Sequence, residues 1–173
     1  MMEIGERTDR IKNTMTNKGG KYLTFNLASE EYGLEILKVQ EIIGVIEVTR
    51  VPQTPKFVRG VINLRGQVIP VIDLRLKFGM EAVEDTERTC IIVVQIDRDG
   101  QQVTTGVIVD DVSEVVDFRN EQIAPPPEFG GDVQIEYILG MGKINKKVVM
   151  LLDIDKVLSA REMEAMDRVS QIQ

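Results

Sequence analysis

Hydrophobic and polar residues alternate over residues 21–27 and again over 32–36, which is the period of β-strands with one buried face. Residues 89–97 and 101–109 are two longer apolar runs, and the turn between them contains an Asp-Gly pair that favours a tight hairpin. These patterns predict a mainly β protein built from short strands.

The spacing of apolar residues changes to three and four at Ile36, Val39 and Ile43, and Gly44 follows. This spacing predicts a short helix that ends at the glycine. A third strand is expected over residues 47–51.

Thr54 and Pro55 have the chemistry of a helix start, with Thr as N-cap and Pro at the first helical position. We expect one helical turn there, ending at Gly60. Residues 60–75 then predict strand, turn and strand, with the turn at 63–66.

The C-terminal part predicts a helix over residues 156–168. Ser159 and Glu162 have the spacing of a capping box, and Met163 and Met166 would give the helix an apolar face.

The chain also carries a weak internal repeat. Three segments of the first half recur in the same order in the second: 33–43 as 106–116, the pair Phe57 and Gly60 as Tyr137 and Gly140, and 68–74 as 148–154. Matching glycines and aspartates in order indicate a duplication. Each unit would hold only about five short strands, which is marginal for a core of its own. We therefore expect two small β units that share an apolar interface, with a groove between them.

The composition restricts the function. Of the 173 residues 43% are hydrophobic, enough for one packed domain, and the net charge of −7 opposes binding of a nucleic acid. With 5% aromatic residues and no Trp, a base-stacking surface is also disfavoured. The one cysteine, Cys90, allows no internal disulfide, and the chain has no histidine. The missing histidine removes the commonest general base and metal ligand and argues against an enzyme.

Residues 1–20 are polar and mixed in charge, without the apolar core of a signal peptide, and we expect a mobile tail there. The apolar runs are too short to span a bilayer, so we expect a cytoplasmic protein without membrane insertion. Residues 21–173 are expected to form a single domain of two subdomains, roughly 21–85 and 86–155. Exchange of strands between the subdomains is left open.

Several aspartates invite a metal or acid–base reading. Asp73 and Asp153 occupy equivalent repeat positions, which suggests a shared structural hydrogen bond. Asp110 and Asp111 are adjacent on a strand and would face opposite sides. These placements disfavour a catalytic site, and no metal or cofactor is expected.

Arg65 has two interpretations. A turn arginine is commonly solvated and without function. Against this, the same turn would expose the neighbouring Leu64, and an arginine beside an apolar side chain is typical of a protein-binding hot spot. Residue chemistry alone leaves both interpretations open.

Residues 32–42 and 57–75 resemble the CheW family of bacterial chemotaxis coupling proteins. The Asn-Leu-Arg-Gly core at 63–66, followed by Pro-Val-Ile-Asp-Leu-Arg at 70–75, is specific to that family. The similarity runs from about Lys21 to the C-terminal helix, with 106–116 more diverged than its N-terminal counterpart.

The resemblance implies two five-stranded, SH3-like β barrels packed on a common hydrophobic core, with short helices. It also implies a non-enzymatic adaptor that joins the histidine kinase CheA to the cytoplasmic tips of methyl-accepting chemoreceptors. The regulatory domain of the kinase would pack barrel end against barrel end, and the receptor's helical hairpin would lie near the groove between barrels. Such a protein would be recruited to membrane-attached receptor arrays.

By match of motif, the resemblance places a receptor-facing site at Asn63, Leu64, Arg65 and Gly66. It also indicates three further partner-contacting positions, without telling which partner each meets: Val39, Glu41 and Gly60. Three other readings remain: a β-barrel hydrolase that uses the aspartates, an oligonucleotide-binding barrel, and a module of a signalling array unrelated to motility.

Overall fold

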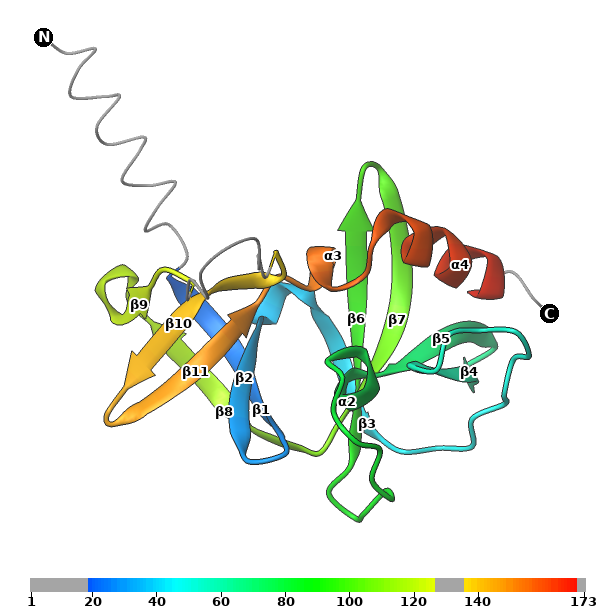
Figure 1. Ribbon diagram of the computed structural model, residues 1–173, viewed down its shortest axis with the longest axis horizontal. Helices are drawn as coiled ribbons and strands as arrows, with labels where there is room; N and C mark the ends of the chain where they lie inside the picture. Colours follow the sequence, from blue (N-terminus) through cyan, green and yellow to red (C-terminus); the bar gives the residue numbers. More distant parts are fainter. Residues whose placement is uncertain (1–18, 127–135, 171–173) are drawn as a thin grey trace, which may run out of the picture.

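The computed structural model describes residues 19–126 and 136–170. The tail expected over 1–20 lies outside this part except for its last two residues. The described residues are mainly β and form two sheets that lie side by side (Figure 1).

Each sheet curls around its own apolar cluster (Figure 1). We call the six-stranded sheet barrel A and the five-stranded sheet barrel B. The strand order of barrel A is β8 (Asp111–Phe118), β1 (Gly20–Leu27), β2 (Glu30–Glu35), β11 (Lys147–Leu152), β10 (Ile138–Ile144), β9 (Ile123–Ala124). The strand order of barrel B is β3 (Val39–Gly44), β6 (Cys90–Arg98), β7 (Gln101–Val109), β5 (Gln67–Asp73), β4 (Val58–Leu64). The predicted fold class is confirmed, and barrel A includes the two-residue β9 as a sixth strand.

Short helices connect and cover the barrels: η1 (Ile36–Lys38), α2 (Leu74–Lys77), η2 (Asn120–Gln122), α3 (Ile154–Val157) and α4 (Ala160–Ser170). The helix expected over 156–168 is therefore divided between α3 and α4. The capping box before α4 is formed, with the Ser159 N–H donating to Glu162 over 2.7 Å and the Glu162 N–H donating to Ser159 over 3.1 Å. α4 packs against β5 and β7 of barrel B.

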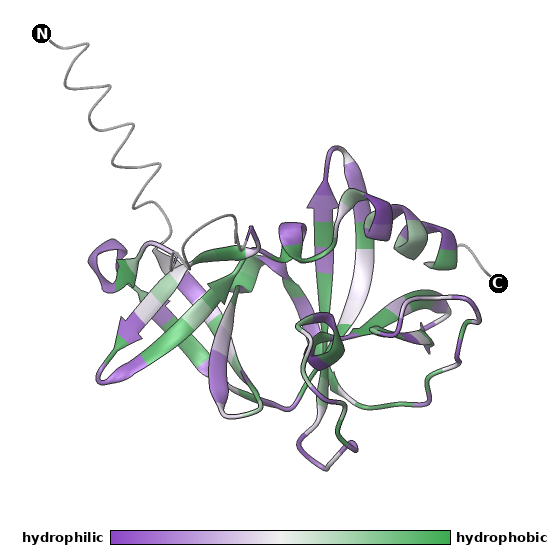
Figure 2. Ribbon diagram, in the orientation of Figure 1, coloured by the Kyte–Doolittle hydropathy of each residue, from purple (hydrophilic) through white to green (hydrophobic). Residues whose placement is uncertain are grey.

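The apolar residues form three clusters, because several strands are hydrophobic on both faces (Figure 2). On β6, Ile91 and Val93 face the interior of barrel B, whereas Ile92 and Val94 face the cluster between the barrels. A strand buried on both sides reads as a continuous apolar run, as residues 90–94 do. The largest cluster is the one between the barrels, so the two barrels share a core.

The two repeats exchange hairpins. Gly33 of the first repeat lies opposite Leu151 of the second, and Gly106 of the second lies opposite Val71 of the first, each in a parallel pairing. Thus β1 and β2 complete the barrel of the second repeat, and β6 and β7 complete that of the first. Neither barrel is built from one continuous half of the chain.

The repeated aspartates have the same structural role. The Asp73 side chain caps α2 by accepting from the Leu76 N–H, and that of Asp153 caps α3 by accepting from the Asp155 N–H. Their own N–H groups donate to the carbonyls of residues 57 and 137, over 2.7 and 2.8 Å. The predicted shared hydrogen bond is confirmed.

Three local predictions were wrong. The helix expected from Ile36 is a single 3-10 turn followed by strand β3, because pairing with β6 overrides the helical spacing. The strand expected over 47–51 is reduced to one bridge between Thr49 and Val61. The turn after Pro55 ends before Val58, and Gly60 lies within β4.

Candidate functional site

The β4–β5 hairpin closes with a two-residue turn. Leu64 pairs with Gln67, and the residues between them, Arg65 and Gly66, have φ angles of 53° and 87°. Positive φ at both central residues is the geometry that matches the twist of a hairpin. The Gly66 N–H donates to Asn63 Oδ1 over 2.8 Å, which fixes the turn. The turn therefore holds the Arg65 side chain out from barrel B.

Arg65 has one partner on another strand. Its guanidinium donates to Glu41 Oε2 over 2.6 Å, although the Arg65 side chain is 72% exposed. This hydrogen bond raises the pKa of the arginine. The other carboxylate oxygen of Glu41 is buried and has no hydrogen-bond partner among the described residues. The orientation of this carboxylate thus depends on Arg65.

Strand β3 carries Glu41 and Val39 to different surroundings. The pairing of β3 with β6 shifts by one residue between Val39 and Glu41, which indicates a bulge at Gln40. Val39 packs against the core between the barrels, while Ile43 packs against the interior of barrel B. The structure therefore brings Glu41 to the Arg65 turn and leaves Val39 nearer the junction.

Gly60 is buried, and its place in the fold is structural. A Cβ atom at this position would lie 2.1 Å from the Thr49 carbonyl oxygen, and its φ of 145° is one that side chains rarely adopt. Thr49 and Val61 exchange two backbone hydrogen bonds of 2.8 Å at this point. Any effect of Gly60 on a partner is therefore indirect, through the segment that holds Thr49.

Leu37 is a surface residue that the sequence analysis missed. It is 93% exposed, in the η1 turn that joins β2 of barrel A to β3 of barrel B. The turn is fixed by Lys38, whose ammonium donates to Asp155 over 2.7 Å. A fixed, exposed leucine at the junction has the character of a protein-binding contact. The sequence contained a signal for it: Leu37 follows Ile36 directly, and only Ile36 lies on the apolar face of the helix predicted there, so Leu37 had to face outward.

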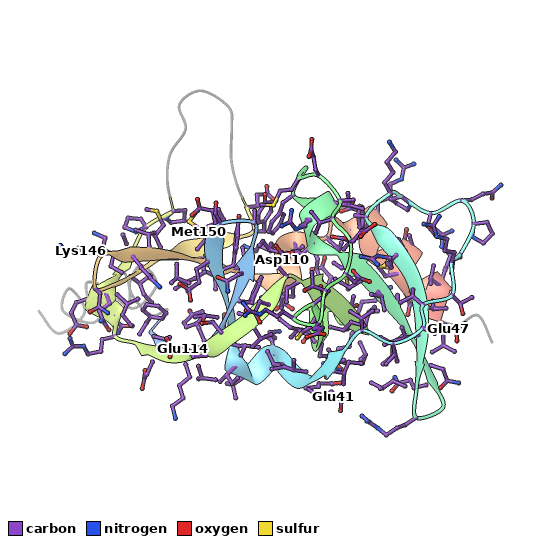
Figure 3. The ribbon with its side chains drawn as sticks, turned by 90° about the horizontal axis from the view of Figure 1, so that it is seen from below. Glu41, Glu47, Asp110, Glu114, Lys146 and Met150 are labelled. Atoms are coloured by element: carbon purple, nitrogen blue, oxygen red, sulfur yellow. The ribbon has the colours of Figure 1, made fainter. Side chains whose placement is uncertain are left out.

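Barrel A repeats part of this surface. Glu114 of β8 stands at the repeat position of Glu41, and both lie on the same side of the molecule in Figure 3, opposite Met150. The next residues along, Ile42 and Val115, are 42% and 51% exposed. Within the described residues, however, the Glu114 carboxylate forms no ion pair, so the paired arginine and glutamate are particular to barrel B.

Asp110, like Asp73 and Asp153, has a structural role. Asp110 accepts from the Arg75 guanidinium over 2.7 and 2.5 Å and from the Ala28 N–H over 2.7 Å. In the part of the chain that the structure covers, no group of three or more His, Cys, Asp or Glu could hold a metal ion. Nor is any described helix long and apolar enough to span a membrane.

The two fused barrels carry an exposed arginine turn, and their aspartates cap helices or form ion pairs. These features together are those of a protein-binding scaffold. Comparison with known proteins agrees with this class. The family model described as the CheW-like domain matches residues 21–162. The chain therefore belongs to the CheW-like family, as predicted, which is a family of non-enzymatic scaffolding proteins.

Individual relatives cover nearly the whole domain. The chain is 46% identical to the chemotaxis protein CheW of Klebsiella aerogenes, over 88% of this chain and 90% of that protein. It is 38% identical to the chemotaxis protein CheW of Helicobacter pylori, over 80% and 81%. The crystal structure of the scaffolding protein TtCheW from Thermoanaerobacter tengcongensis is similar with a TM-score of 0.72, at 35% identity over 82% of this chain and 94% of that one.

Proposed function

We propose that this protein couples the histidine kinase CheA to methyl-accepting chemoreceptors, so that the state of the receptor controls the kinase. Membership of the CheW-like family supports this, since the relatives from Klebsiella aerogenes and Helicobacter pylori are named chemotaxis proteins. The single observation that carries the site is the exposed Arg65 guanidinium held by Glu41 at the turn of barrel B. The protein would act in the cytoplasm, at the receptor arrays.

The receptor-facing surface is centred on the Arg65 turn. Arg65 offers the free part of its guanidinium to acceptors on the receptor tip. Leu64, which was expected to be exposed, is half-buried against the interior cluster of barrel B, so only part of its side chain adds apolar area beside Arg65. Asn63 and Gly66 keep the turn in shape. Glu41 keeps the guanidinium in one orientation, which reduces the entropy lost on binding.

Leu37 and Val39 extend this surface to the junction of the barrels. Leu37 is fully available for contact, whereas the half-buried Val39 positions β3 beneath it. A helical hairpin from the receptor would then cross from the Arg65 turn to the junction. The receptor would then contact both an apolar anchor, Leu37, and a charged anchor, Arg65.

The mechanism is mechanical coupling without covalent chemistry. The regulatory domain of CheA would pack against a barrel end, and the shared core makes the two barrels one rigid body between the partners. A conformational change in the receptor then changes the energy of the kinase states by a coupling free energy of about 1–3 kcal/mol.

Co-precipitation tests the proposal. The purified protein should capture the CheA regulatory domain and a soluble receptor-tip fragment together. Arg65→Ala should lose the receptor fragment and keep the kinase domain, while Lys146→Ala, at the equivalent turn of barrel A, should keep both. Capture of neither partner by the wild-type protein contradicts the proposed function.

A further inference from the structure

A cavity of about 690 Å³ opens on barrel B and shares no lining residue with the Arg65 turn. Its walls are two irregular segments, around residues 50–56 and 82–85, and Arg59 and Asp73 lie between them. The volume is within the roughly 300–1,000 Å³ of typical small-molecule sites. The proposed scaffold function uses none of these residues.

Arg59 joins the segment around residues 82–85 to strand β5. Its guanidinium donates over 3.1 Å to the nearly buried Asp73, and over 3.2 and 3.3 Å to the two carboxylate oxygens of Asp85. Asp85 thus engages the arginine in a bidentate manner from a segment that has no helix or strand. The interaction is the one that a bound carboxylate or phosphate would make.

The internal repeat shows that the fold does not require this arginine. Leu139 stands at the position of Arg59 in the second repeat. Asp153, the equivalent of Asp73, caps α3 without an ion pair in the described part of the chain. Capping therefore needs the aspartate alone, and the arginine at the cavity is an addition to barrel B.

Both ion pairs of Arg59 are long, 3.1 Å with Asp73 and 3.2 Å with Asp85, and the Asp85 side chain is the more exposed of the two partners, at 33%. Its 3.2 Å contact is the longest among the ion pairs of the described residues, against 2.5 Å for Arg75 with Asp110 and 2.6 Å for Arg65 with Glu41. Charge-assisted bonds are usually about 2.7–2.9 Å long. Because water screens a pair that is partly exposed, Asp85 can be displaced from Arg59 at small cost.

Two more cations line the same cavity. Arg50 and Lys56 are exposed on the wall opposite Asp85, and neither forms an ion pair within the described residues. The cavity lining thus carries three cations and three carboxylates, those of Asp73, Glu84 and Asp85. Of the cations, Arg59 alone forms ion pairs among the described residues, with Asp73 and Asp85. A ligand with several negative charges would gain interactions that Asp85 cannot make.

We propose that this cavity binds a small multivalent anion, an organic phosphate or a polycarboxylate, on Arg59, Arg50 and Lys56. Asp85 occupies the place of the anion when no ligand is bound. Binding displaces Asp85 and frees the segment around residues 82–85 from Arg59. The site makes the scaffold able to respond to a metabolite.

Displacement of Asp85 by the anion predicts opposite effects of two substitutions on anion affinity. Arg59→Gln removes the main anion-binding group and should abolish binding. Asp85→Asn removes the internal competitor, and if Asp85 occupies Arg59 about nine-tenths of the time, the apparent Kd should fall about tenfold. A purely structural role for the pair would make both variants bind anions worse or leave both unchanged.

The test is calorimetric titration of the full chain with pyrophosphate and, separately, with citrate, at constant ionic strength. Asp99→Asn, which removes one negative charge at a distant hairpin turn, is the control for net charge, and melting temperatures verify that each variant folds. We expect binding by the wild-type protein, tighter binding by Asp85→Asn, none by Arg59→Gln, and wild-type binding by Asp99→Asn; the stronger of the two anions identifies the class. If Asp85→Asn binds no tighter than Asp99→Asn, or if neither anion binds, the proposal is wrong.

Discussion

The Arg65 guanidinium and the Glu41 carboxylate lie 2.6 Å apart, although Arg65 is in the β4–β5 turn, Glu41 is on β3, and 24 positions of the chain separate them. The pair joins the β4–β5 turn to β3, the strand that leads to the junction of the barrels. Because Arg65 is largely exposed, the pair adds little to the stability of the fold. Its value is the orientation that it gives to a surface arginine.

A double-mutant cycle tests this orientation. Glu41→Ala and Arg65→Ala should each weaken binding of a receptor-tip fragment. The double variant should lose little more than Arg65→Ala alone, because Glu41 acts through the arginine. Calorimetric Kd values measure the coupling. Losses that simply add would show that Glu41 contacts the receptor independently of Arg65.

Leu37→Ser should weaken the same binding by about tenfold or more, the loss expected for an apolar hot spot. The melting temperature should not fall, since a side chain that is 93% exposed contributes little to the core. Val148→Ser is the matched control, because Val148 is an apolar residue of barrel A with 49% exposure. Equal loss from both variants would remove Leu37 from the site.

Gly60→Ala should destabilise the fold by on the order of 3 kcal/mol. The added Cβ would lie 2.1 Å from the Thr49 oxygen in a conformation that alanine rarely adopts. Gly44→Ala on β3 is the control, because a Cβ there meets nothing within 4 Å. Urea unfolding measures both. Similar stability of the two variants would mean that the Thr49 segment gives way freely.

The pair of Asp110 and Arg75 predicts a pH dependence of stability. Burial favours the protonated carboxyl, but the hydrogen bonds from Arg75 and from the Ala28 N–H outweigh it, so the pKa of Asp110 lies below its ordinary value of 3.8. The stabilisation is therefore complete above that value and is lost as the pH falls through the folded-state pKa. At pH 7, Asp110→Asn should cost about 1–3 kcal/mol.

Unfolding free energies measured from pH 7 down to pH 3 should show the difference between wild type and Asp110→Asn becoming smaller at the acid end. Asp111→Asn provides the control, since the neighbouring Asp111 forms no ion pair within the described residues. A difference that is independent of pH would assign the effect to packing.

Much of the architecture could be predicted from the sequence, because the repeat and the strand periodicity report local chemistry. The hairpin of β6 and β7 and the capping box at Ser159 follow from residues near each other in the chain. The matching roles of Asp73 and Asp153 follow from their equivalent positions in the repeat. The exchange of hairpins did not follow. It depends on which strand lies beside Gly33, and that choice is made by the shared core over a distance of more than 100 residues.

The candidate site was predictable only in part. The motif at 63–66 pointed to Arg65, but its pairing with Glu41 requires the two strands to be placed in space. The error at residues 36–43 has a physical cause, since the bulge in β3 breaks the alternation that identifies a strand. Because a helix was predicted where the chain forms a 3-10 turn, the exposure of Leu37 was not predicted either.

The most direct test is kinase activity in an array reconstituted from receptor, CheA and this protein. With Arg65→Ala, the kinase should no longer respond to receptor ligand, while the variant keeps the wild-type melting temperature and Lys146→Ala behaves as wild type. Full activation and normal ligand response with Arg65→Ala would contradict the account.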